Sequence, residues 1–134
     1  MKPLPARPVL ACAFIALLGA GCASQVPPAG GPADTDPPEI VSTVPVPGEL
    51  NYHGERFIVR FSEYVDKRSF QESVFLSPPA GRLGFEWSST EVAIVPSDTL
   101  MEAVTYNLTV GTDLKDTRNN RLAGSFTLPF STGG

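Results

Sequence analysis

The sequence predicts an all-β domain built from two packed sheets. From Pro38 onward, short segments in which apolar and polar residues alternate are separated by proline, glycine and polar turn residues. Such alternation is typical of strands that bury one face, and frequent turn residues favour short antiparallel strands. No window longer than eight residues shows a convincing helical period with capping residues. These observations favour a sandwich over a helical or mixed fold.

The clearest predicted strand covers residues 57–61. Phe57, Val59 and Phe61 share one face of it, and Ile58 and Arg60 share the other. Proline confines the first of the remaining strands to a sheet edge. Seven strands in about 95 residues match the size and strand spacing of an immunoglobulin-like sandwich. The other six are expected around residues 40–46, 74–76, 83–87, 92–95, 106–110 and 126–130.

The first 21 residues are predicted to be an export signal that is removed. Lys2 and Arg7 precede an apolar run over residues 9–20, which is shorter than the ~20 residues of a membrane-spanning helix. Small residues then lead to Cys22, a pattern that resembles the lipobox of bacterial lipoproteins. The resemblance implies cleavage before Cys22 and lipid on its thiol and amino group. Because Cys12 lies in the removed segment, no free thiol or disulfide would remain.

Residues 22–37 are predicted to be a solvated tether. Proline and glycine are frequent in this stretch, and Val26 is its only apolar residue larger than alanine. Asp34 and Asp36 invite a calcium interpretation, but we expect them to be solvated linker charges. The folded domain is expected to cover residues 38–134.

The net charge of the chain and the residue types that it contains argue against several functions. Without Lys2 and Arg7 the chain keeps eight basic and fourteen acidic side chains, a net charge of −6. This balance argues against nucleic acid as a partner. His53 is the only histidine and has no cysteine or second histidine to join it, so a zinc site or nucleophilic triad lacks parts. We expect no catalytic residues and no cofactor.

Two groups of polar residues are candidate sites. Glu63 and Asp66 follow the clearest strand, and paired carboxylates can perform acid–base work on a glycoside. A sandwich this small rarely offers the necessary pocket, so solvated charge is favoured. Asp113 and Asp116 precede two asparagines at 119 and 120, and such oxygens can bind calcium. Interleaved basic residues and turn chemistry argue against an ion, so no metal site is expected.

Three residues are predicted to be structural. Leu100 lies six residues before Tyr106, which opens an alternating strand. This spacing indicates a tyrosine corner, in which the phenol bonds a backbone group a few residues upstream; a half-buried strand aromatic is the alternative. Trp87 alternates with Leu83 and Phe85, so we expect a core residue rather than a sugar-stacking platform.

A series of short motifs runs along the predicted mature chain: Cys22-Ala23, Gly30-Gly31-Pro32, Asp34, Pro37-Pro38, Phe61-Ser62-Glu63-Tyr64-Val65, Ser77-Pro78-Pro79, Leu100 with Tyr106, Asp116 with Asn119, and Phe130-Ser131-Thr132-Gly133. Together these motifs resemble the bacterial Ig-like domain of Bacteroidetes and Chlorobi-type lipoproteins, which is related to repeats in S-layer proteins. The resemblance implies a sandwich on a membrane anchor with no catalytic residues. Because Ala23, not aspartate, follows Cys22, we expect the outer membrane of the cell envelope. We expect a non-catalytic binding or spacer module with an envelope protein or glycan partner; the alternative is a glycan-binding accessory domain or a small glycan hydrolase.

Overall fold

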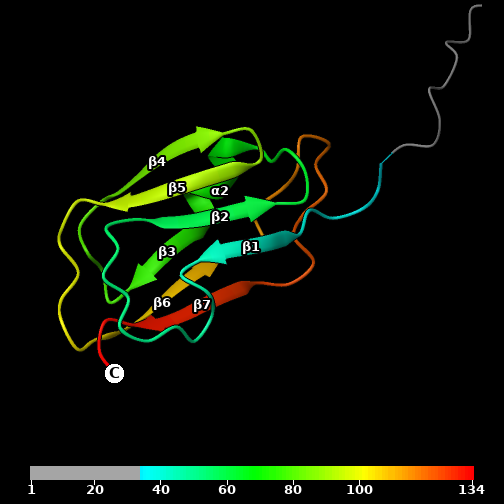
Figure 1. The fold of residues 1–134 in the computed structure, drawn as a ribbon. Helices are drawn as coiled ribbons and strands as arrows, with labels where there is room; N and C mark the ends of the chain where they lie inside the picture. The colour runs from blue at the N-terminus through cyan, green and yellow to red at the C-terminus, as the bar shows by residue number, and fades with distance from the viewer. Residues whose placement is uncertain (1–33) are drawn as a thin grey trace, which may run out of the picture. The chain divides into compact units, whose positions relative to one another are not determined.

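In the part of the chain that the structure describes, seven strands form two sheets that pack face to face, and one short helix accompanies them (Figure 1). The computed structural model describes residues 34–134. The predicted signal peptide, Cys22 and the tether up to residue 33 lie outside these residues. In chain order the elements are β1 (Ile40–Val44), β2 (Phe57–Phe61), α2 (Lys67–Ser73), β3 (Val74–Ser77), β4 (Leu83–Ser88), β5 (Glu91–Pro96), β6 (Thr105–Val110) and β7 (Phe126–Ser131).

The strand order is that of an immunoglobulin-like sandwich, as the sequence predicted. One sheet has the order β1-β2-β5-β4 and the other β3-β6-β7, and neighbouring strands are antiparallel. When β1 to β7 are lettered A to G in chain order, these are the sheets ABED and CFG of a seven-stranded constant-type immunoglobulin domain. β1 and β7 are edge strands on the same side of the sandwich and run in the same direction (Figure 1).

The core lies between the inner faces of the sheets. On β2 the predicted inward residues Phe57, Val59 and Phe61 are buried, whereas Arg60 is exposed. Phe130 on β7 packs against Phe57 across the two sheets, with ring centroids 5.2 Å apart. Residues 34–134 form a compact unit that contains every strand and the whole described core, so this unit has what it needs to fold on its own.

After β1 the chain crosses from one sheet to the other. The amide of Gly48 donates to the carbonyl of Pro129 (2.6 Å), and Glu49 accepts from the amide of Ser131 (2.9 Å). Glu49 and Phe130 on β7 therefore form an isolated parallel β-bridge. This segment covers the second half of the β7 edge.

The sequence analysis did not predict α2. Its N-terminus is capped by Asp66, whose side chain accepts a hydrogen bond from the Ser69 amide (2.8 Å). Phe70 is fully buried and meets Phe61 edge-on at 5.5 Å. Seven residues with one large apolar side chain give too little periodicity to detect. Among residues 34–134, no helix has the length and apolar character to cross a membrane.

Tyr106 and Trp87 both contribute to packing. Tyr106 is buried, and its hydroxyl accepts a hydrogen bond from the amide of Met101 (2.9 Å), which is the bond of a tyrosine corner. Leu100 is partly buried against the same core. Trp87 is half-buried and stacks on Phe61, with centroids 6.4 Å apart.

Replacing Tyr106 with phenylalanine should destabilise the domain by about 1 kcal/mol, because the Met101 amide loses its acceptor. Thermal unfolding should show a midpoint lower by about 4–8 °C. Tyr64, which is 60% exposed, provides the control: Tyr64→Phe should change stability by less than about 0.5 kcal/mol. Equal effects of the two changes would contradict a stabilising corner.

Candidate functional site

Three carboxyl groups from distant parts of the chain meet at one end of the sandwich. Asp34 precedes β1, Glu63 follows β2, and Asp116 lies in the loop between β6 and β7. One oxygen from each lies within 4.8 Å of the others. Asp34 was expected to be a solvated linker charge, but the compact unit begins at this residue, four positions before the expected boundary at 38. Asp34 thus belongs to the domain.

Asp116 is the buried centre of this cluster, at 2% exposure. Its Oδ1 accepts hydrogen bonds from the amides of Arg118 (2.8 Å) and Asn120 (2.9 Å), and its Oδ2 accepts one from Asn120 Nδ2 (3.0 Å). The same Asn120 amide group also donates to the backbone carbonyl of Asp34 (3.0 Å). Asn119 takes the positive φ of 68° that the turn requires, which asparagine tolerates. One carboxylate therefore holds the loop and, through Asn120, the segment before β1.

The same loop is tied to α2. Lys115 accepts through its carbonyl from the Asp66 amide (2.9 Å) and donates its own amide to Ser69 Oγ (3.0 Å). The Asp66 carboxylate is occupied with the helix cap. Glu63 and Asp66 were expected to be solvated charges, but Asp66 caps α2 and Glu63 lies beside Asp116.

Asp113 and Asp116, which the sequence analysis considered together, have separate roles. Asp113 is exposed and forms an ion pair with Arg121 at 2.9 Å. It takes no part in the carboxyl cluster of the described residues. The turn chemistry expected around Asp116 is present, but sequence reasoning missed the contact between Asn120 and Asp34. Both lie in or beside the motifs of the family resemblance, and this was the only signal that could have brought them together.

The pKa values of Glu63 and Asp116 are shifted in opposite directions. The hydrogen bond to Asp116, then burial, then the charges of Asp116, Asp34 and Asp36 raise the pKa of Glu63 to about 7. Burial opposes ionisation of Asp116, but hydrogen bonds from Glu63, Asn120 and Arg118 outweigh it and hold the pKa of Asp116 below its usual range. Below pH 7 Glu63 is the protonated partner and Asp116 the carboxylate.

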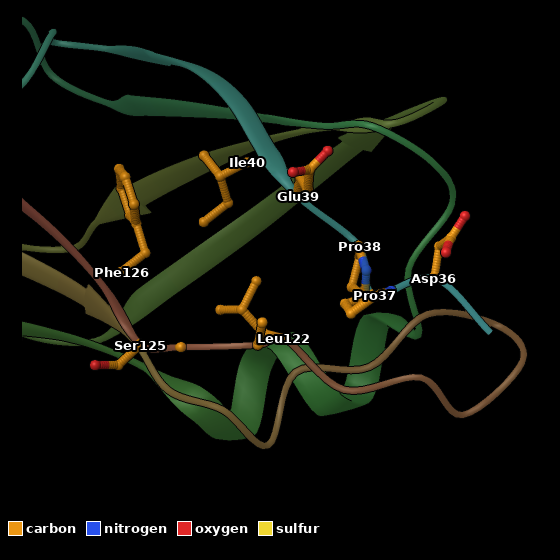
Figure 2. Close-up of a pocket in the computed structure, with 10 residues that line it drawn as sticks. Asp36, Pro37, Pro38, Glu39, Ile40, Leu122, Ser125 and Phe126 are labelled. Atoms are coloured by element: carbon orange, nitrogen blue, oxygen red, sulfur yellow. The ribbon is translucent and has the colours of Figure 1, made fainter.

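A groove opens beside this cluster, between the starts of β1 and β7 (Figure 2). It encloses about 460 Å³. Residues 36–40 form one wall, and residues 122–126 form the other. Asp34 leads into the first wall and Asn120 into the second, so the Asp116 cluster positions both. Ile40, Leu122 and Phe126 supply apolar surface inside the groove (Figure 2).

His53 lies far from the groove, before the start of β2, whereas the groove lies where β2 ends. It lines a separate pocket with residues 95–102, and it makes no hydrogen bond to any residue of the described range 34–134. No histidine and no cysteine of the described residues lines the groove or meets the carboxyl cluster.

Comparison with known proteins explains the fold and the motifs. The sequence profile of the bacterial Ig-like domain matches residues 34–132. The chain belongs to the bacterial Ig-like domain family. Comparison with curated proteins gave no significant match.

Several solved structures resemble this Ig-like domain. An L,D-transpeptidase from Mycobacterium smegmatis aligns at 25% identity with a TM-score of 0.54, over 73% of this chain and 41% of the transpeptidase. PcoC, a methionine-rich copper resistance protein from Escherichia coli, aligns at 17% identity with a TM-score of 0.52, over 70% of this chain and 98% of PcoC. L,D-transpeptidase 1 from Mycobacterium tuberculosis aligns at 22% identity with a TM-score of 0.51, over 72% and 39%. The chain thus spans about two fifths of the transpeptidases it resembles.

Removing the Asp116 carboxylate should destabilise the domain strongly. Asp116→Ala leaves two backbone amides and the Asn120 side chain without their acceptor, which we expect to cost about 3 kcal/mol. Asp113→Ala, in the same loop, removes one exposed ion pair and should cost less than about 0.5 kcal/mol. Urea denaturation of both variants measures the difference. Similar losses would show that Asp116 does not organise the loop.

Stability should fall as pH rises toward 8. The pKa of Glu63 is raised on folding from 4.5 to about 7, so its protonated form stabilises the fold fully below pH 4.5, and this contribution disappears as pH passes through 7. We expect the stability of the domain to be lower at pH 8 than at pH 5, because the folded chain then gives up the proton that Glu63 holds. Glu63→Gln should remove this dependence.

The control for the pH experiment is Glu55→Gln, the same chemical change on an exposed side chain. It should leave the pH profile of the wild-type chain unchanged. A wild-type profile that is flat from pH 5 to pH 8, or one that Glu63→Gln leaves intact, would contradict the raised pKa of Glu63.

We still expect no calcium binding at the cluster. Calcium takes six to eight oxygen ligands, whereas both oxygens of Asp116 already accept hydrogen bonds and Arg118 lines the adjoining pocket. At 1 mM calcium the melting temperature should not change. A site with a dissociation constant near 10 μM would stabilise by about 2.7 kcal/mol, or roughly ten degrees. Such a rise, abolished by Asp34→Asn, would contradict this prediction.

Proposed function

We propose that the chain is a non-catalytic, lipid-anchored module of the cell envelope that acts as a binding or spacer domain. The observation that carries this proposal is that the acidic residues considered as catalytic or metal-binding candidates have structural roles. Asp66 caps α2, Asp116 organises a loop, and Asp113 pairs with Arg121. Membership of the bacterial Ig-like domain family supports the same function.

Glycan hydrolysis is the weaker alternative. The two carboxyl groups of a glycosidase usually lie about 5–5.5 Å apart for retention or 6.5–9.5 Å apart for inversion. One oxygen of Glu63 lies within 4.8 Å of one oxygen of Asp116, and Asp116 is buried with both of its oxygens accepting hydrogen bonds. The Asp116 carboxylate is therefore not free to hold an attacking water in the way an inverting enzyme requires.

The likeness to L,D-transpeptidases does not favour acyl transfer by this chain. Acyl transfer through a covalent intermediate requires a nucleophile with a base in hydrogen-bonding reach. Residues 34–134 contain no cysteine, and His53 has no hydroxyl as a hydrogen-bond partner there. We infer that this chain corresponds to a supporting portion of such proteins, in keeping with the two fifths of their length that it spans.

Anchoring is proposed from the sequence. Cys22 follows an apolar run with basic residues before it, and Asp34, the first residue of the domain, comes twelve positions later. Two or three acyl chains meet the requirement for stable attachment to a membrane. Ala23 after the cysteine supports the outer membrane as the destination.

Changing Cys22 to serine should abolish labelling of the chain with radioactive palmitate and leave an unprocessed precursor in the producing bacterium. Cys12→Ser is the matched control, since it alters the other cysteine within the segment expected to be removed. It should leave labelling and processing as in the wild type. Palmitate labelling that persists in Cys22→Ser would overturn the anchor, and wild-type chain in the inner-membrane fraction would contradict the outer-membrane assignment.

A further inference from the structure

We propose that the groove between the starts of β1 and β7 binds an extended, positively charged peptide as an added strand on β7. This inference rests on the proposed binding function and specifies its partner class. It concerns a surface on which residues 36–40 and 122–126 face each other (Figure 2).

The first half of β7 has an unpaired backbone edge. The segment from Gly48 to Tyr52 bonds to the second half of β7, through the carbonyl of Pro129 and both backbone groups of Ser131. These groups therefore point away from β6. Because backbone direction alternates along a strand, Thr127 points its amide and carbonyl to the same outer side. No residue of the range 34–134 hydrogen-bonds to them from that side.

The groove gives an added strand a place for its side chains. Ile40, Leu122 and Phe126 line it, and Ile40 and Phe126 are only partly buried where they pack on the core. In strand addition, backbone bonds to an edge supply affinity and pockets for alternate side chains supply specificity. A strand on β7 would direct every second side chain into this apolar space.

The β1 edge is less suited to pairing than the β7 edge. The register of β1 against β2 shifts between Ile40 and Ser42, which marks a bulge or irregularity. Such features and prolines are the usual protection of sheet edges. On β7 the proline, Pro129, lies in the half that the chain already covers, so Thr127 remains unprotected.

Charge decides the kind of peptide. Asp36 and Glu39 are exposed at the groove, and none of its lining residues is basic. Residues 34–134 carry fourteen acidic and eight basic side chains, a net charge of −6. A cationic segment is therefore attracted, whereas a second copy of this chain would bring the same acidic groups together.

The test uses the chain from Ala23 to Gly134, labelled with nitrogen-15, and the blocked peptide KVKVKVK. We expect shifts of amide resonances confined to residues 36–40 and 122–128, and amide exchange at Thr127 slowed at least tenfold. The peptide EVEVEVE, and KVKVKVK methylated at its three central backbone nitrogens, should each bind at least tenfold more weakly. These results would support strand addition to the β7 edge.

Variants separate the backbone and charge contributions. Thr127→Pro places a proline in the register that Pro129 already occupies, and it should weaken KVKVKVK at least tenfold. The double change Asp36→Lys and Glu39→Lys should weaken KVKVKVK and strengthen EVEVEVE. Its control, Glu55→Lys with Glu102→Lys, alters exposed residues of the separate pocket that contains His53 and should leave both affinities unchanged.

Three results would overturn the proposal: no shift at 1 mM KVKVKVK, equal binding of the methylated or acidic peptide, or shifts outside the groove. Concentration-dependent dimerisation with shifts at the groove, in the absence of peptide, would assign the surface to a second copy instead. The experiment uses unlipidated chain, so its failure leaves the membrane anchor untouched, and loss of palmitate labelling would leave the docking surface untouched.

Discussion

The buried carboxylate of Asp116 is the constraint on which one whole end of this domain depends. A charge at 2% exposure is costly unless hydrogen bonds compensate it, and here three donors within the loop converge on its two oxygens. Glu63 adds a protonated partner, and Asn120 extends the network to the backbone of Asp34. The loop, the chain before β1 and the groove between them are consequently one connected unit.

This arrangement explains how a small sandwich without disulfides can present a defined surface. The sheets supply the apolar core, but two edge strands leave a gap on one side, and loops must form its walls. Lys115 links the β6–β7 loop to α2, and Asn120 links it to Asp34. Buried polar contacts thus hold the walls of the groove in place, whereas apolar packing holds the strands. Both oxygens of the buried Asp116 accept hydrogen bonds, as a buried polar group requires.

Apolar alternation was sufficient to predict the sandwich, because β2 and its neighbours bury one face each and their periodicity lies in adjacent residues. Tyr106 was recognisable for the same reason, since its hydrogen bond reaches only five positions upstream. The partner of Glu63 was not, because Asp116 is 53 positions away and nothing local indicates which carboxylates will meet. Asp34 was assigned to a tether by its proline-rich surroundings, although its contact to Asn120 spans 86 positions. Long-range polar pairs are set by the topology, which composition does not reveal.

Hydrogen exchange of the Arg118 and Asn120 amides tests the central role of Asp116 most directly. Both amides lie in a surface loop, where unbonded groups exchange rapidly, yet both donate to Asp116 Oδ1. If the carboxylate holds this end of the domain together, these two amides should exchange as slowly as those of the core strands β2 and β6, and only by unfolding of the domain. Exchange at the rate of an open loop, with the core strands still protected, would contradict the account.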